Sequence, residues 1–322
     1  MPRPKAWLMV FRVLPVLVWS GMASVCGVAL ARMDGVVLDW RSFALVASIT
    51  ALVQGFPAHI INEIYDWKSG ADAYQPLGRA SGGSKVLKTG LASIPQLWIM
   101  FGITFAVILA LSALACRFID IRLLFFICGG IGAALCYTLP PFRLAYRPFA
   151  GEWLGGFPGI FLAVTGNYYA QAHTLTSTSV TAATAIGAVY VAIMIFFHLV
   201  DFEGDSATGK RTTVVFLGLE RSRRYAIACL TLSTLLFIVL AIGNYGFIVL
   251  AAESAGLALI FRRTDPGSPA AIVLNGRWIT YATVIGAQLF SVTADPRLSV
   301  MLLAVAAGYF LHYRFGKIRA AT

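Results

Sequence analysis

Long apolar runs recur along the whole sequence, and they constrain the fold more than any other feature. Hydrophobic residues make up 59% of the 322 residues, charged residues only 12%, and the mean hydropathy is +0.79. An apolar run of about 18 or more residues can cross a bilayer. Backbone groups in hydrocarbon must bond within their own segment, which favours helices. The sequence therefore predicts an all-α polytopic membrane protein with nine or ten transmembrane helices, at about 13–31, 42–62, 94–115, 123–139, 153–171, 179–200, 225–242, 246–261, 278–294 and 298–314.

Positive charges are unevenly distributed over the connections between these runs. With the N-terminus in the cytoplasm, 20 of the 25 Lys and Arg residues fall on the cytoplasmic side, as the positive-inside rule requires. The remaining five are Arg32, Arg41, Arg117, Arg122 and Arg297. The net charge of +11 is therefore a topology signal and does not indicate nucleic acid as a partner.

The connections on the cytoplasmic side are longer than those on the other side and hold most of the ionisable residues, and the two dominant ones are 62–93 and 198–224. Each follows an even-numbered predicted span, begins with acidic residues and then becomes basic, and four predicted helices separate the two. This repetition predicts two parallel four-helix halves around a central cavity. The whole chain, 1–322, is then one transmembrane domain, with halves at about 13–140 and 153–262 and extra C-terminal helices at 278–314.

The acidic residues in these connections have the spacing of a ligand site. Asn62 and Asp66 are four residues apart, as are Asp201 and Asp205, so each pair projects from one face of a helix. Carboxylates at membrane depth are costly and usually mark function. Together with Asp72 they offer the hard oxygen ligands that Mg²⁺ prefers. Either pair alone is also typical of a solvated helix end, but two pairs in corresponding positions favour a shared site.

Basic residues follow both acidic clusters, which a simple cation pore would not need. Arg79, Lys85, Lys210 and Arg211 are suited to a diphosphate, because Arg binds phosphate oxygens bidentately and Lys binds them as a point charge. Arg143, in the connection between the two clusters, is a further candidate for phosphate contact or a topology anchor.

Three further residues are notable. Tyr137, at a predicted helix end, is either an interfacial aromatic residue or part of the cavity wall. His198, one turn before Asp201, is either a contact for a second substrate or a buried hydrogen-bonded histidine. Glu253 falls in the middle of a predicted span, where it needs a partner that the sequence does not identify.

At these residues the sequence resembles the UbiA superfamily of intramembrane prenyltransferases, whose members carry N-D-x-x-D-x-x-x-D early and D-x-x-x-D later. Asn62 and Asp66 match the first motif, with Glu63 in place of an Asp and Asp72 two residues beyond the position of the third acid. The second motif matches closely over residues 201–218. The resemblance extends over about residues 10 to 315.

Several segments resemble in particular the branch that acts on 1,4-dihydroxy-2-naphthoate in menaquinone synthesis. These are D-W-K-S-G-A-D at 66–72, R-A-S-G-G-S at 79–84, L-x-Y-x-x-x-x-G-E at 144–152 and G-N-Y-Y-A-Q at 166–171. The chain departs from this branch just before the second motif, where His198 and Val200 replace an Asn and an Arg.

The resemblance implies ionisation of an allylic isoprenyl diphosphate and attack on the resulting cation by an aromatic or quinone-precursor acceptor. It implies two Mg²⁺, one group of ligands being Asn62, Asp66 and Asp72 and the other Asp201 and Asp205. Arg79, Lys85, Lys210 and Arg211 would add positive charge where negative charge develops. It also implies an integral protein of the bacterial inner (plasma) membrane, with the N-terminus and the active-site loops on the cytoplasmic side and the prenyl tail near membrane lipid.

Two rival functions use the same features. A membrane terpene cyclase of this superfamily needs the same ionisation step but no acceptor, so a cyclic hydrocarbon formed from geranylgeranyl diphosphate and Mg²⁺ alone would identify it. From a different class, a transporter of a cation or a phosphorylated solute could also use intramembrane acids and repeated halves. A transporter would make no product, and it should tolerate loss of one acidic cluster with altered affinity.

Overall fold

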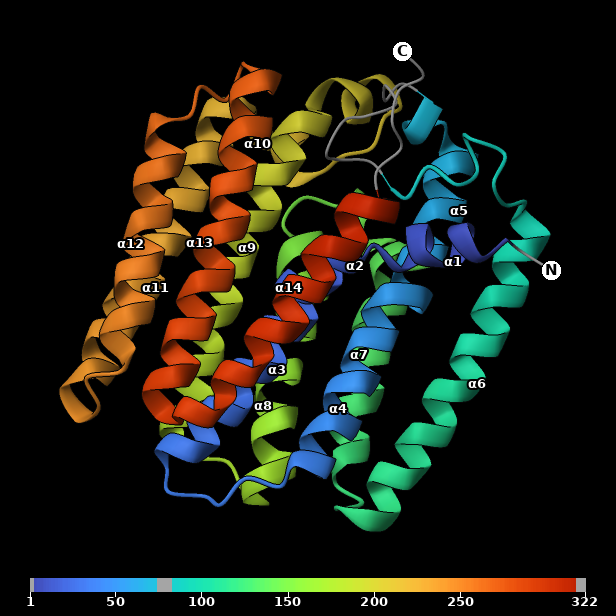
Figure 1. Cartoon of the computed structure of the whole chain (residues 1–322). Coiled ribbons are helices and arrows are strands. Elements are labelled where there is room, and N and C mark those ends of the chain that lie inside the picture. Colours follow the sequence, from blue (N-terminus) through green and yellow to red (C-terminus); the bar gives the residue numbers. More distant parts are fainter. Residues whose placement is uncertain (1–2, 74–82, 317–322) are drawn as a thin grey trace.

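A computed structural model of the chain describes residues 3–73 and 83–316. In those residues the fold is entirely helical, as predicted, and each of the ten predicted spans overlaps a helix (Figure 1). The first five spans correspond to α1–α3 (Pro4–Phe11, Val13–Val16, Met22–Met33), α4–α5 (Trp40–Val53, His59–Ser69), α6 (Ile94–Phe118), α7 (Leu123–Thr138) and α8 (Phe157–Ala172). The others correspond to α9 (Ser177–Ala207), α11 (Leu219–Gly243), α12 (Phe247–Arg263), α13 (Pro269–Ala294) and α14 (Met301–Leu311).

Several of these helices adjoin a short π-helical or 3₁₀-helical segment. π-Helical turns occur at η1 (Leu17–Gly21), η2 (Gln54–Ala58), η5 (Gly151–Gly156) and η7 (His312–Gly316), and 3₁₀ turns at η3 (Ala71–Ala73), η4 (Leu144–Tyr146) and η6 (Pro296–Val300). The short helix α10 (Thr213–Leu217) precedes α11. π-Turns inside helices are frequent at functional sites, and η2 and η5 both adjoin the cavity described below.

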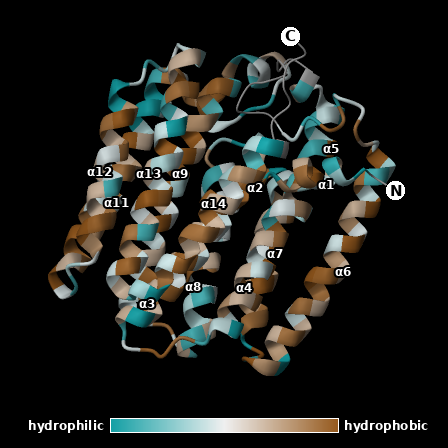
Figure 2. Cartoon of the chain, viewed as in Figure 1, coloured by the Kyte–Doolittle hydropathy of each residue, from teal (hydrophilic) through white to brown (hydrophobic). Residues whose placement is uncertain are grey.

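By length and composition alone, five continuous helical stretches of the described chain can cross a membrane. They are Pro4–Met33, Trp40–Ser69, Ile94–Phe118, Ser177–Ala207 and Leu219–Gly243. The peripheral helix α6 exposes Ile99, Ile103 and Leu109 on its outer face, and Figure 2 shows brown, hydrophobic residues along the whole helix. An apolar exterior of this kind fits lipid contact. The protein is an integral membrane protein.

Helix α9 is the most deeply buried of these stretches, with α11 and α13 packed against it. Helix α8 also packs against α9, and α3 packs against α8. Gly27 of α3 allows that approach, because an added Cβ would overlap the carbonyl oxygen of Val164 on α8. Small residues bring membrane helices together in this way. In the same manner Gly286 of α13 makes room for the Glu253 side chain, which lies in the interface with α12.

Some helix boundaries differ from the predicted ones for local reasons. Helix α13 begins at Pro269, nine residues before the predicted 278, because the Ser268 side chain caps it and proline suits the first turn. Helix α9 continues to Ala207, so both residues of its acidic pair lie within the helix. The helical stretch Pro4–Met33 contains a break at Arg12, one residue before the predicted start of the first span, and the φ of Arg12, 52°, is left-handed.

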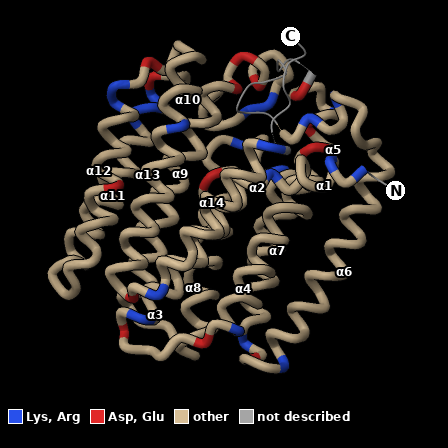
Figure 3. Tube along the Cα trace, in the orientation of Figure 1, with Lys and Arg blue, Asp and Glu red and all other residues tan. Residues whose placement is uncertain are grey.

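Charged residues gather at the two ends of the bundle and leave its middle largely uncharged (Figure 3). The acidic end of α5 and the acidic end of α9 lie at the same end of the molecule (Figure 1). This arrangement is the one that the two long connections predicted. The division into repeated halves at about 13–140 and 153–262 stays a prediction.

Candidate active site

A cavity of about 930 Å³ lies between the helices, and residues of both acidic clusters line it. Its walls come from α2, α4, α5, α7, α8, α9 and α13, together with η7. All five predicted metal ligands line it: Asn62, Asp66, Asp72, Asp201 and Asp205. The structure therefore brings together two clusters that are more than 120 residues apart in the sequence.

Asp66 is at the centre of the polar end of the cavity and is buried. Its Oδ2 accepts a hydrogen bond from Nδ2 of Asn62 at 3.0 Å, which the four-residue spacing on α5 makes possible. Its Oδ1 accepts one from the hydroxyl of Tyr146 at 2.7 Å. These two donors fix the carboxylate in one orientation.

Lys210 connects the two acidic clusters. Its ammonium nitrogen lies 3.3 Å from Asp66 Oδ2 and 3.8 Å from Asp205 Oδ1, so one cation bridges α5 and α9. Burial by itself would lower the pKa of Lys210, but the two carboxylates beside it raise the pKa overall. The ammonium also lies 5.1 Å from the centre of the Tyr146 ring. Lys210 is therefore held charged at the junction of the clusters.

Asp72 is buried at the rim of the cavity in η3. Burial raises the pKa of its carboxyl to about 7, and the negative charges of Asp66 and Glu63 contribute to that rise. A group in this position binds a cation readily, because a nearby positive charge would offset both effects.

Glu63 does not line the cavity, although it holds the second position of the family's first motif, where an Asp is usual. Its Oε2 accepts a hydrogen bond from the backbone N–H of Ser84 at 2.5 Å. Gly83 allows this contact: its φ is +64°, and an added Cβ would lie 2.6 Å from Glu63 Oε2 and 3.1 Å from Asp72 Oδ2. Glu63 therefore anchors the segment that carries Lys85 into the cavity wall.

The side-chain oxygens of Asn62, Asp66, Asp72, Asp201 and Asp205 suit divalent cations that keep part of their shell of bound water. Within residues 3–73 and 83–316, no three His, Cys, Asp or Glu side chains form a ready-made metal cage. Mg²⁺ typically takes one or two carboxylates and fills its other positions with water and substrate phosphate oxygens. Carboxylates lie on both sides of one cavity, and burial together with neighbouring like charges raises the pKa of Asp72. Both features are suited to that mode of binding.

The predicted basic residues divide into two groups. Lys85 and Lys210 line the cavity, whereas Arg143 and Arg211 are not among its lining residues. The Arg143 guanidinium lies over the Tyr146 ring, 4.9 Å from its centre, and Arg211 is exposed. Arg79 lies outside the described residues. Phosphate contact by Arg79, Arg143 and Arg211 stays a prediction.

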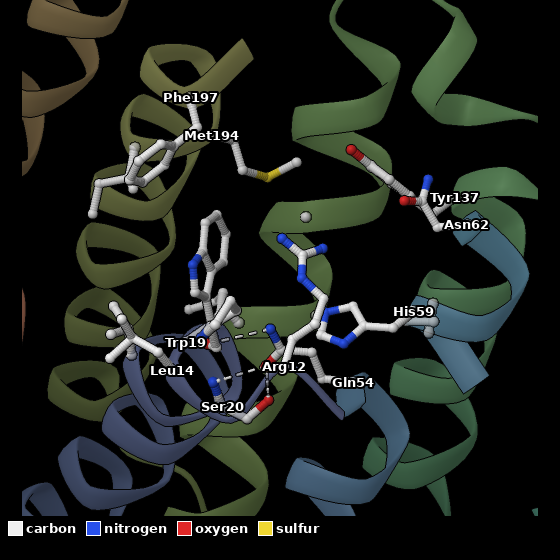
Figure 4. A pocket seen from close by; sticks show the side chains of 18 of the residues that line it. Arg12, Leu14, Trp19, Ser20, Gln54, His59, Asn62, Tyr137, Met194 and Phe197 are labelled. Atoms are coloured by element: carbon white, nitrogen blue, oxygen red, sulfur yellow. Dashed lines mark hydrogen bonds between the residues drawn. The ribbon is translucent and has the colours of Figure 1, made fainter. Parts of the chain in front are cut away.

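Arg12 lines the cavity, although the sequence predicts it only as one of the 20 positive charges on the cytoplasmic side. Its side chain points into the cavity beside His59 and Trp19 (Figure 4). The left-handed backbone at Arg12 turns the chain between α1 and α2. In the sequence Arg12 stands between two apolar runs, immediately before the predicted first span, and this position does not indicate where its side chain points.

Tyr137 and His198 both line the cavity, so both predicted cavity candidates are in place. Tyr137 lies next to Gly155 of η5, where an added Cβ would be 2.7 Å from its Cδ2. His198 Nδ1 lies 3.3 Å from Oε1 of Glu152, which is buried. Beyond them the cavity wall is mostly apolar, with contributions that include Val46, Ile49, Phe126, Ile127, Leu162 and Phe197.

Comparison with known proteins defines the class. The model of the UbiA prenyltransferase family matches residues 20–278. A 1,4-dihydroxy-2-naphthoate octaprenyltransferase of Escherichia coli (strain K12) is 32% identical over 246 residues, covering 74% of this chain and 76% of that protein.

Two solved structures of a UbiA homolog from Archaeoglobus fulgidus share the fold. The complex with DMAPP and Mg²⁺ has a TM-score of 0.66 at 18% identity, covering 86% of this chain and 97% of that one. The complex with GPP and Mg²⁺ has a TM-score of 0.66 at 18% identity, covering 87% and 98%. The fold and the comparisons together define a membrane-embedded prenyltransferase. This chain belongs to the UbiA prenyltransferase family, which confirms the resemblance found in the sequence.

Proposed function

We propose that this enzyme transfers an isoprenyl group from an isoprenyl diphosphate to an aromatic acceptor of the 1,4-dihydroxy-2-naphthoate type, with release of diphosphate. The observation that carries the proposal is the meeting of the α5 and α9 carboxylates at one end of a cavity whose remainder is largely apolar. A cavity with one charged and one apolar end matches a molecule with a diphosphate head and a hydrocarbon tail.

The diphosphate binds at the charged end in this proposal. Asn62, Asp66 and Asp72 on one side and Asp201 and Asp205 on the other would hold two Mg²⁺, which neutralise the departing diphosphate. Lys210, Lys85 and Arg12 supply fixed positive charge around the same space. The solved relatives bound to DMAPP or GPP with Mg²⁺ support a prenyl diphosphate and Mg²⁺ as the ligands of this cavity.

The prenyl chain and the acceptor occupy the apolar part. Side chains from α4, α7 and α8 line the cavity there, and they exclude water from the allylic cation that would otherwise be converted to an alcohol. The naphthoate-type acceptor is supported by the named activity of the E. coli relative. The distribution of Lys and Arg supports a bacterial plasma membrane location with the N-terminus and the active-site end cytoplasmic.

Mass spectrometry of the reaction products tests this proposal. Purified enzyme with Mg²⁺, geranyl diphosphate and 1,4-dihydroxy-2-naphthoate should yield a prenylated naphthalene and diphosphate. A parallel incubation with geranylgeranyl diphosphate and no acceptor should yield no cyclic hydrocarbon. A cyclic product in that second incubation, with no prenylated acceptor in the first, would replace the transferase with a terpene cyclase.

A further inference from the structure

One side of the cavity carries polar and aromatic side chains, whereas the side formed by α4, α7 and α8 is mostly apolar. Helix α14 runs beside α13 and past α2 (Figure 1). We use the term α13–α14 wall for Arg277, Tyr281, Thr283 and Tyr309, which line the cavity from these two helices. The family model matches only residues 20–278, so three of these four residues lie beyond the matched segment. The family match therefore gives these three residues no role.

The α13–α14 wall offers an aromatic surface and two hydroxyls that have no partner. The rings of Tyr281 and Tyr309 pack together, with 5.8 Å between their centres and 34° between their planes. The hydroxyl oxygens of Tyr309 and Thr283 are buried, and within residues 3–73 and 83–316 neither has a hydrogen-bond partner. A buried hydroxyl without a partner costs free energy, so these two groups point to a ligand that supplies the missing bond. A prenyl chain has no group that could do so, whereas a hydroxylated aromatic ring has both a flat face and hydrogen-bonding groups.

Arg277 lies on the same face of α13 as Tyr281, because the two are four residues apart. Its position is about 12 Å along the helix from Pro269, where a charged side chain is costly without a partner. The side chain is exposed and lines the cavity, and in the part of the chain that the structure describes it makes no hydrogen bond or ion pair. The cation that pairs with the acidic clusters is Lys210, not Arg277. The Arg277 guanidinium is therefore available to a second anionic ligand.

A planar aromatic carboxylate matches these groups. A guanidinium binds a carboxylate through two parallel hydrogen bonds, and tyrosine rings pack against an aromatic ring. In 1,4-dihydroxy-2-naphthoate the 1-hydroxyl is next to the carboxylate and bonds to it, so the 4-hydroxyl is free to bond to another group. The α13–α14 wall has a partner for each part of such a molecule: a guanidinium, two rings and the Tyr309 hydroxyl.

We propose that the α13–α14 wall is the binding site of the acceptor, with Arg277 on its carboxylate and the Tyr309 hydroxyl on its 4-hydroxyl. The inference rests on the proposed function, because it locates the acceptor of that reaction. Both residues bind and orient the acceptor, and neither takes part in breaking or forming a covalent bond. Their loss should therefore weaken acceptor binding and leave the binding of the prenyl diphosphate unchanged.

Binding of three naphthalenes to the full chain tests the two contacts separately. The enzyme is first saturated with Mg²⁺ and geranyl S-thiolodiphosphate, an analogue that does not react, and acceptor affinity is then measured by titration calorimetry without oxygen. The ligands are 1,4-dihydroxy-2-naphthoate, 1,4-dihydroxynaphthalene, which lacks the carboxylate, and 1-hydroxy-2-naphthoate, which lacks the 4-hydroxyl. Nanodiscs of phosphatidylcholine, which has no net charge, exclude an anionic lipid as the partner of Arg277.

Arg277→Met should weaken binding of the two carboxylates at least about tenfold, because a hydrogen-bonded ion pair is lost, and should leave 1,4-dihydroxynaphthalene unaffected. Arg277→Gln, which keeps a hydrogen-bond donor but not the charge, is a second variant at this position and should discriminate in the same way. The matched control is Arg263→Met, which alters an exposed arginine at the end of α12 outside the cavity wall. It should bind all three ligands as the wild type does.

Tyr309→Phe should weaken binding of the two ligands that carry a 4-hydroxyl by about threefold or more, because one neutral hydrogen bond is lost. It should leave 1-hydroxy-2-naphthoate unaffected. The matched control is Tyr245→Phe, which alters an exposed tyrosine outside the cavity wall and should change none of the three affinities.

The outcomes distinguish the two proposals. If the wild type prenylates 1,4-dihydroxy-2-naphthoate and both Arg277→Met and Tyr309→Phe bind all three ligands with wild-type affinity, the proposed acceptor site is wrong and the proposed function stands. A loss that is equal for all three ligands, or that comes with weaker thiolodiphosphate binding, would mean a structural or diphosphate role and would also overturn the site. If the wild type prenylates no hydroxylated aromatic acceptor, the proposed function fails and this inference fails with it.

Discussion

Asp201→Ala should reduce prenyl transfer by on the order of 10²–10³-fold or more, and Asp66→Ala should have an effect of the same size. Both carboxylates line the cavity, one from α5 and one from α9. In the proposed metal site each would provide oxygen ligands that the other cannot replace. The measurement is the initial rate of diphosphate release and of prenylated product, with Mg²⁺ and both substrates at saturating concentrations.

Glu203→Ala is the matched control for Asp201→Ala. Glu203 is an acid two residues further along α9, but it is exposed and does not line the cavity. Its loss should leave the rate unchanged. Substantial turnover by either Asp66→Ala or Asp201→Ala would contradict the metal roles proposed for the two clusters.

Lys210→Met should also reduce transfer strongly, on the order of 10²-fold. Lys210 is the cation that bridges Asp66 and Asp205, and it is the described lysine best placed to meet the leaving diphosphate. The variant should in addition have a lower melting temperature in EDTA, because two buried carboxylates lose their counter-charge. Added Mg²⁺ should raise its melting temperature more than that of the wild type, since the ion replaces part of the lost positive charge.

Arg211→Met provides the comparison. Arg211 follows Lys210 directly but is exposed and outside the cavity wall, so its loss should change the rate by little. Equal reductions in rate for Lys210→Met and Arg211→Met would show that the two residues act through their general positive charge. The position of the Lys210 ammonium group would then not matter.

Hydropathy and spacing were sufficient to predict much of this molecule. The apolar runs that are long enough to cross a bilayer predicted the positions of the helices, because the length and composition of a segment decide whether it can span hydrocarbon. The four-residue spacing within Asn62–Asp66 and Asp201–Asp205 placed each pair on one helix face. The repeated pattern then indicated that the two pairs share one cavity, which the structure confirms.

Contacts between residues far apart in the chain could not be predicted in the same way. The pairing of Glu152 with His198 depends on a π-turn and on the packing of two helices, and neither has a local sequence signal. The place of Arg12 depends on a left-handed break just before the predicted first span. Arg143 and Arg211 have the right charge and the right loops, but their side chains lie outside the cavity, because a loop assignment does not fix a side-chain direction.

The most direct test of the central claim is the affinity of the enzyme for geranyl S-thiolodiphosphate, whose C–S bond resists ionisation, measured by titration calorimetry with Mg²⁺ and with EDTA. We expect binding to require Mg²⁺. We also expect both Asp66→Ala and Asp201→Ala to weaken binding by at least about tenfold, because contacts to charged groups contribute about 1.5–3 kcal/mol each. Equal affinity in EDTA, or wild-type affinity in either variant, would contradict a metal–diphosphate site shared by the two clusters.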